Sequence, residues 1–156
     1  MIVDSHNWKV QTTSTNDTWG TPIALYNTLN SLFQFTFDCC ASEENKLCER
    51  YSVDIENETI DKDEILWCNP PYSRGIQARL TTHLIYKTTN PLVLLVPARP
   101  ATKLWQEHYF NYPILFLKSQ LKFQDAKHNA PFASALIFVR CENYDLSKLN
   151  KLGARK

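Results

Sequence analysis

The chain has 156 residues, of which 44% are hydrophobic, enough for one domain with a buried core but not for two. Its formal net charge of +1 excludes both a globally basic nucleic-acid binder and an acidic mimic of nucleic acid, so any basic surface must be local. No stretch is long and apolar enough to span a membrane, and with only three glycines a glycine-rich phosphate loop is excluded.

The first third of the chain predicts a polar arm, a helix and a strand-to-helix turn. Residues 1–17 lack periodicity, and we expect a flexible N-terminal arm there. Thr21 and Pro22 are typical of a helix start, and apolar residues continue at helical spacing to residue 33. Residues 35–38 predict a strand, and 43–49 a helix capped by Ser42. Free N–H groups at the helix start beside Thr21 suit a carboxylate, and Asp38 suits an ammonium group. A plain cap is the commoner role of such a threonine, and a turn the commoner role of such an aspartate.

Residues 51–54 predict a second strand, which ends at Asp54. An acid in this place often holds ribose hydroxyls in α/β folds. Asp54 nevertheless opens an acidic run, for which a solvated loop is the default explanation. The five cysteines have no C-x-x-C spacing, so we expect no metal and reduced thiols in a cytoplasmic protein.

Residues 65–73 are the most informative stretch. A short apolar strand, 65–68, stops at Asn69, which Pro70, Pro71 and Tyr72 follow. Because prolines cannot join a ladder and hold the preceding residue extended, the Asn69 amide and the Pro70 carbonyl are expected at the carboxyl end of a strand, where α/β sheets bind ligands. Two acceptors there can bind both hydrogens of a planar amino group while the Tyr72 ring lies flat on it. An ordinary strand ending in a turn explains these four residues equally well.

The second half predicts a helix over 73–88, a central strand over 91–97, a helix over 101–111, and strands over 114–117 and 134–139. The central strand ends near Arg99. Residues 118–132 mix basic and aromatic residues, which fits phosphate contact with base stacking, or a solvated connection. Residues 146–156 are a basic tail that we expect to fray.

The order of these elements predicts an α/β fold with a mainly parallel open sheet, helices on both faces and an antiparallel edge hairpin. We expect a single domain over residues 18–145.

Five motifs, in order and together spanning most of the chain, resemble the small phage-type DNA N6-adenine methyltransferases, which depend on S-adenosylmethionine and have a Rossmann-like fold. They are Trp19-x-Thr21-Pro22, Phe37-Asp38-Cys39-Cys40-Ala41-Ser42, Trp67-Cys68-Asn69-Pro70-Pro71-Tyr72-Ser73, Leu95-Val96-Pro97-Ala98-Arg99, and Leu121-Lys122-Phe123 with Ala130-Pro131-Phe132. The chain departs from this pattern in having no glycine at the first turn and Ser119-Gln120 before Leu121.

The resemblance implies a site-specific enzyme that methylates N6 of adenine in double-stranded DNA after flipping the base. It implies catalytic residues Asn69, Pro70, Pro71 and Tyr72, and cofactor contacts from Trp19, Thr21, Pro22, Asp38, Cys40, Ala41 and Asp54. We expect DNA contacts from Arg74, Arg99, Lys118, Lys122 and Lys127.

Three questions stay open at this point. The amino group could instead belong to a protein glutamine or an RNA guanine, and the chain could be an inactive nucleic-acid-binding module on the same scaffold. Sequence specificity is expected from residues 118–132 or from a second subunit in a homodimer. The location implied is the cytoplasm, that of the host if the protein is phage-encoded.

Overall fold

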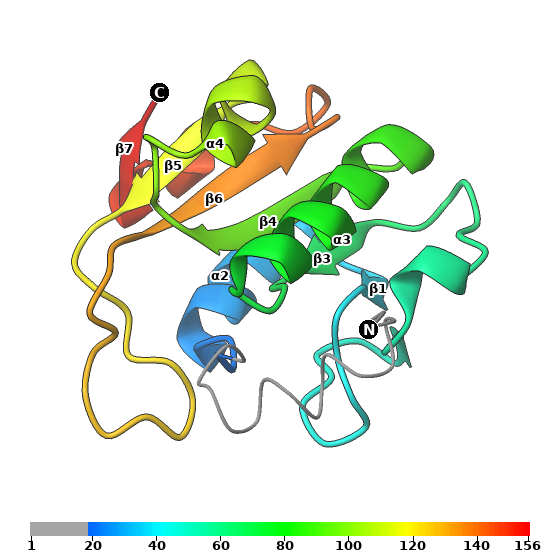
Figure 1. Ribbon diagram of the computed structural model, residues 1–156, viewed down its shortest axis with the longest axis horizontal. Coiled ribbons are helices and arrows are strands. Elements are labelled where there is room, and N and C mark those ends of the chain that lie inside the picture. The colour runs from blue at the N-terminus through cyan, green and yellow to red at the C-terminus, as the bar shows by residue number, and fades with distance from the viewer. Residues whose placement is uncertain (1–18) are drawn as a thin grey trace.

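A seven-stranded sheet forms the centre of the computed structural model, which describes residues 19–156 (Figure 1). The strand order is β2-β1-β3-β4-β6-β5-β7. Pairing is parallel from β2 to β4, whereas β6 is antiparallel to both β4 and β5, and β7 is antiparallel to β5. Five strands therefore share one direction. The strands are β1 (Phe37–Asp38), β2 (Arg50–Tyr51), β3 (Leu66–Cys68), β4 (Leu92–Pro97), β5 (Ile114–Leu117), β6 (Ser134–Val139) and β7 (Gly153–Arg155).

Helices cover both faces of this sheet. One face carries α2 (Ile23–Phe33) and the 3-10 helix η3 (Leu146–Leu152), and the other carries α3 (Arg74–Lys87) and α4 (Lys103–Glu107), which lie toward the viewer in Figure 1. Two more 3-10 helices, η1 (Ile55–Asn57) and η2 (Tyr109–Asn111), follow β2 and α4. The fold is the α/β arrangement that the element order predicts, and it is the Rossmann-like fold that the resemblance implied.

The central strand β4 shows why both faces need helices. All six of its residues are buried, and they alternate between the two cores. Leu92 and Leu94 join the core under α3, whereas Val93 and Leu95 join the core under α2. A strand buried on both faces is apolar throughout rather than alternating, which is the pattern of residues 91–97.

The prediction of a helix over 43–49 is wrong, because side chains satisfy the backbone there in place of helical bonds. The Asn45 Oδ1 atom accepts from the Ser42 N–H at 2.7 Å, and the Asp38 Oδ2 atom accepts from the Leu47 N–H at 3.0 Å. The segment therefore forms turns that wrap around Asp38. The strand expected at 51–54 is also shorter, because β2 ends at Tyr51. Asp54 is not the end of a strand and instead occupies the N-cap position of η1.

The helix expected over 101–111 is broken near its middle. It consists of α4 and η2, which meet at His108, where the backbone leaves helical geometry (φ −124°, ψ −62°). Trp105 and Tyr109 remain buried on the sheet side of the two segments. The strands predicted over 114–117 and 134–139 are confirmed with those bounds.

The expectation that the C-terminal residues fray is wrong. Residues 146–152 form η3, and β7 pairs with β5, so the predicted hairpin does not lie at the sheet edge. Gly153 permits this pairing, because a Cβ atom there would lie 1.9 Å from the Phe116 carbonyl oxygen. The division into an arm and a domain remains a prediction, and the arm over 1–17 lies outside the described residues.

Candidate active site

The carboxyl ends of β1 and β3 bring two candidate residues to one edge of the sheet. Asp38 ends β1 and is paired in register with Trp67 of β3. Asn69 follows the last residue of β3 directly. Because the two strands are parallel neighbours, both side chains come out at the same edge, as the resemblance implied.

Three hydrogen bonds orient the Asn69 side chain. Its Nδ2 atom donates to the Trp19 carbonyl and, at 3.0 Å, to the Thr21 hydroxyl. Its Oδ1 atom accepts from the Tyr72 hydroxyl at 2.6 Å. A backbone carbonyl can only accept, so the amide nitrogen must face Trp19 and the oxygen must face Tyr72. The side chain therefore presents its acceptor away from the N-terminal segment.

Tyr72 lies inside the protein rather than over an open site. Its ring is 3% exposed, and its hydroxyl also lies 3.2 Å from the Leu95 carbonyl. Phe123 and Phe132 contact the ring edge-on, at centroid distances of 6.3 and 5.8 Å. Burial raises the pKa of Tyr72 well above its ordinary value, so the phenol is neutral. In this conformation the ring can stack on a base only after the two phenylalanines move.

The prolines between Asn69 and Tyr72 are both buried. No described residue donates a hydrogen bond to the Pro70 carbonyl, which follows the Asn69 amide directly. Because a carbonyl oxygen has two lone pairs, both acceptors of the expected amino-group clamp keep capacity for a ligand.

Asp38 is a buried carboxylate held by backbone donors. It is 3% exposed, and burial raises its pKa to about 7, an effect that the N–H groups of Leu47 and Cys40 partly offset. Within residues 19–156 no lysine or arginine pairs with it. The Sγ atoms of Cys40 and Cys68 lie 3.5 Å apart beside it, both as free thiols. A buried carboxylate without a cation is suited to bind a positively charged ligand group.

A segment that we call the strap, residues 19–21, covers the space between Asp38 and Asn69. Gln124, in the loop formed by residues 118–132, connects that loop to the strap. Its backbone N–H donates to the Gly20 carbonyl at 2.9 Å, and its Nε2 atom donates to the Thr21 carbonyl at 2.7 Å. Trp19 also packs on Phe123 with ring centroids 5.3 Å apart. The strap and residues 118–132 therefore close over the site together.

The cavity under the strap is small, about 30 Å³, which is the share of one water molecule in the liquid. Asp38 and Asn69 both line it. Of the other residues expected to contact a cofactor, Trp19, Thr21 and Cys40 line this cavity as well.

Pro22, Ala41 and Asp54 do not line this cavity. Pro22 precedes α2, and its carbonyl accepts the Tyr26 N–H. The Ala41 N–H donates to the Ser52 carbonyl at 3.0 Å. The Asp54 Oδ2 atom accepts from the Asn57 side chain at 2.8 Å within η1. The structure thus brings together four of the seven residues expected around a cofactor.

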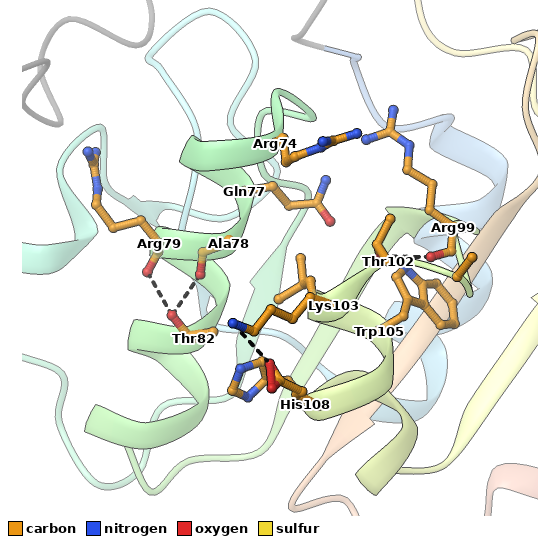
Figure 2. A pocket seen from close by; sticks show the side chains of 13 residues that line it. Arg74, Gln77, Ala78, Arg79, Thr82, Arg99, Thr102, Lys103, Trp105 and His108 are labelled. Atoms are coloured by element: carbon orange, nitrogen blue, oxygen red, sulfur yellow. Dashed lines mark hydrogen bonds and ion pairs between the residues drawn. The ribbon is translucent and has the colours of Figure 1, made fainter.

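The residues expected to contact DNA fall into two groups. Arg74 and Arg99 line a second, larger cavity between α3 and α4 (Figure 2). Lys118, Lys122 and Lys127 are exposed on the loop that follows β5, and none of them lines either cavity. The aromatic Phe123 of the same loop is 2% exposed, so it packs inward and does not present its ring to solvent.

Sequence reasoning missed two glutamines. Gln124 fastens the strap from a position 103 residues away, and no local pattern signals such a contact. Gln77 is 3% exposed and lines the larger cavity. The sequence feature that could have pointed to it is a polar residue on the buried side of the helix predicted over 73–88.

Neither a membrane span nor a metal site is found in the described part of the chain. No helix within residues 19–156 is long and apolar enough to cross a membrane. No group of three or more His, Cys, Asp or Glu side chains there could hold a metal ion.

Comparison with known proteins identifies a family and a phage relative. The family model described as DNA N-6-adenine-methyltransferase (Dam) matches residues 9–150. A protein of Escherichia phage T1 named DNA N-6-adenine-methyltransferase is 37% identical over 62 residues, which cover 37% of this chain. The match spans only 26% of the length of that phage T1 protein.

Proposed function

The chain belongs to the Dam family of DNA N-6-adenine-methyltransferases, and from that membership we propose that it methylates N6 of adenine in double-stranded DNA with S-adenosylmethionine. The observation that carries the proposal is the orientation of Asn69 at the carboxyl end of β3. Its two amide hydrogens are committed to Trp19 and Thr21, which leaves its oxygen as an acceptor of fixed direction.

The residues around Asp38 fit the methionine end of S-adenosylmethionine. Asp38 supplies a buried negative charge for the ammonium group, and Thr21 at the start of α2 lies on the other side of the small cavity. The cofactor supplies a methyl group on a positively charged sulfur, which is already a good leaving group. The cavity of about 30 Å³ must widen first, and the strap with Gln124 is the part that must move.

The amino group of the target adenine would be held by the Asn69 oxygen and the Pro70 carbonyl. Both hydrogens of the NH₂ group would then have acceptors, which would leave the nitrogen lone pair available to the methyl donor, and one N6 proton would be lost to solvent as the methylated product forms. Rate enhancement comes from positioning and from acceptors that are already in place. Tyr72 donates its hydroxyl to Asn69 and so holds the amide oxygen in that direction.

Adenine N6 is paired and stacked in a duplex, so the base must leave the helix to reach Asn69. Movement of residues 118–132 would uncover the Tyr72 ring by withdrawing Phe123 and Phe132. The exposed Lys118, Lys122 and Lys127 on the same loop would contact DNA phosphates. The same segment would therefore both contact the DNA and move to uncover Tyr72. Sequence specificity, a homodimer and a cytoplasmic location remain predictions.

A second candidate is an inactive nucleic-acid-binding module, which the small cavity under the strap favours. Calorimetry with S-adenosylmethionine separates the two, because a module of this kind gives no binding heat at high micromolar cofactor.

The main experiment measures transfer of a labelled methyl group from S-adenosylmethionine to DNA, RNA and protein fractions. We expect label in DNA, recovered as N6-methyladenine after digestion, and label in RNA or protein would instead favour a guanine or glutamine substrate. Asn69→Ala should lower the single-turnover rate by about 100-fold or more, as loss of a preorganised polar group does. Asn150→Ala, at an exposed position of η3, is the matched control. A normal rate in Asn69→Ala would reject the role of that residue.

A further inference from the structure

The larger cavity between α3 and α4 is separate from the space under the strap. Its volume is about 700 Å³, within the usual range of ligand sites. Its lining includes five basic side chains and one carboxylate, Glu107, which lies 3.9 Å from Lys103. The basic residues are Arg74, Arg79, Arg99, Lys103 and His108. Arg79 pairs with Glu56 and Lys103 with Glu107, so among the described residues the positive charge without a carboxylate comes from Arg74 and Arg99, and it suits an anionic ligand.

Two guanidinium groups point toward the same end of this cavity (Figure 2). Arg74 is the first residue of α3, Arg99 follows β4, and their guanidinium groups point toward one another in Figure 2. Neither has a carboxylate partner within residues 19–156. Two positive groups that face each other repel unless an anion lies between them.

Gln77 adds a third donor at the same end of the cavity. Its Oε1 atom accepts from the buried Tyr109 hydroxyl at 3.1 Å, which directs its Nε2 atom the other way. In Figure 2 the amide nitrogen points toward the end of the cavity where the two guanidinium groups lie. Nε2 has no hydrogen-bond partner among the described residues, although the side chain is only 3% exposed. Because Gln77 lines the cavity, this amide nitrogen is available to donate to a ligand oxygen there.

We propose that Arg74, Arg99 and Gln77 together bind one phosphodiester group of the DNA strand, next to the nucleotide whose base enters the Asn69 site. The proposal rests on the proposed function. A phosphate offers several acceptor oxygens and a charge that suits two planar guanidinium forks. The amino-terminal end of α3, a helix of 14 residues, adds a favourable dipole.

A hydrogen bond of Arg99 links this cavity to the active site. Its Nη1 atom donates to the Tyr72 carbonyl at 3.1 Å. A phosphate bound by Arg99 is therefore fixed relative to the segment that carries Asn69 and Tyr72. This link favours a phosphodiester of the substrate strand over a free phosphate ion.

The test measures the affinity for a fluorescein-labelled, mixed-sequence DNA duplex by anisotropy over a series of salt concentrations. Arg74→Gln and Arg99→Gln should each lower the slope of log K against log salt by about 1, as loss of one phosphate contact does. Because both arginines hold the same phosphate, the double variant should lose no more than about 1 as well. Arg155→Gln, exposed on β7, is the matched control and should keep the slope of the unmodified protein.

Gln77→Glu is a second variant, which places a carboxylate between the two arginines and should therefore fold. It should weaken DNA binding about tenfold by occupying the phosphate position. Unchanged slopes in both arginine variants, an additive loss in the double variant, or unchanged affinity in Gln77→Glu would each overturn the proposal. A free anion is tested by calorimetry with inorganic phosphate. Saturable phosphate binding that Arg99→Gln abolishes while DNA affinity stays unchanged would also overturn it.

These results are distinguishable from failure of the proposed function. If the unmodified protein methylates adenine but the arginine variants bind DNA normally, the phosphate site fails and the function stands. If the slope falls by about 1 in the arginine variants but the unmodified protein transfers no methyl group, the function fails and the phosphate site stands.

Discussion

Asn69 and Thr21 are 48 residues apart in the chain, yet the Nδ2 atom of Asn69 lies 3.0 Å from the Oγ1 atom of Thr21. This bond joins the turn after β3 to the start of α2 across the small cavity that Asp38 also lines. The orientation of the proposed catalytic amide therefore depends on the segment that covers the cofactor space. Binding of the cofactor and alignment of the amide are expected to be coupled through Thr21.

Thr21→Val tests this coupling. Valine has nearly the same shape, but it removes the acceptor and leaves one Asn69 hydrogen without a partner. We expect the single-turnover methylation rate to fall about tenfold, the effect of a lost hydrogen bond of 1–2 kcal/mol. Thr28→Val is the matched control, because Thr28 donates only to the Ala24 carbonyl within α2. An unchanged rate in Thr21→Val would mean that the Trp19 carbonyl alone orients the amide.

Asp38 predicts a pH dependence of stability. Burial raises its folded-state pKa to about 7 from an ordinary value near 4, so between these values the folded protein binds more protons than the unfolded chain. Stability without cofactor should therefore fall as the pH rises from about 4 to about 7, and level off above. Asp38→Asn should remove this part of the dependence in urea unfolding followed at several pH values.

The same group predicts the pH dependence of ligand affinity. The ammonium group of the cofactor pairs with ionised Asp38, so the affinity for S-adenosylhomocysteine should increase as the pH rises through about 7. Calorimetry of the unmodified protein and of Asp38→Asn checks this, and the variant should bind weakly with no such rise. Equal pH profiles for the two proteins would exclude Asp38 as the ammonium partner.

The sequence predicted the candidate site best where its residues lie at the ends of strands. Apolar runs and Pro-Pro predicted β3, β4 and the turn at Asn69, and parallel pairing then brings Asp38 to the same edge. The absence of a helix over residues 43–49 was not predictable in this way. The backbone donors of this segment are satisfied by Asp38 and Asn45 side chains, and such local competition with helix formation is invisible in apolar periodicity.

Contacts between distant segments were the other limit. Periodicity gives a residue's face but not its partner, so neither the strap closed by Gln124 nor the pairing of β7 with β5 could be read from the sequence. The Tyr72 ring shows the same limit. Its position beside Asn69 was predicted, whereas its burial under Phe123 and Phe132 depends on how residues 118–132 fold back.

Gln124→Ala tests whether the strap limits cofactor entry. The substitution removes the side-chain bond to the Thr21 carbonyl but keeps the backbone bond to Gly20. Loss of about 1 kcal/mol from the closed state should speed association of S-adenosylhomocysteine about fivefold in stopped-flow fluorescence. Gln120→Ala, exposed in the same loop, is the control and should associate at the original rate. Equal rates for both variants would show that opening of the strap does not limit entry.

Arg140 is expected to be the main support of the far end of α3. Its guanidinium donates to the carbonyls of Leu84, Ile85 and Asn90 and to the Thr88 hydroxyl, at 2.7 to 3.2 Å. These bonds satisfy acceptors that the end of a helix leaves free. Arg140→Ala should therefore lower the free energy of unfolding by about 2–4 kcal/mol, and Arg140→Lys by nearly as much, because an ammonium cannot reproduce the planar fork.

Urea denaturation of both Arg140 variants measures this, with Lys148→Ala at an exposed position of η3 as the control. Because Arg140 lies at the opposite end of α3 from Arg74, folded Arg140 variants should keep the DNA affinity of the unmodified protein. A lysine variant as stable as the unmodified protein would show that positive charge alone supports the helix end. Lost DNA affinity in a folded variant would show that the two ends of α3 are coupled.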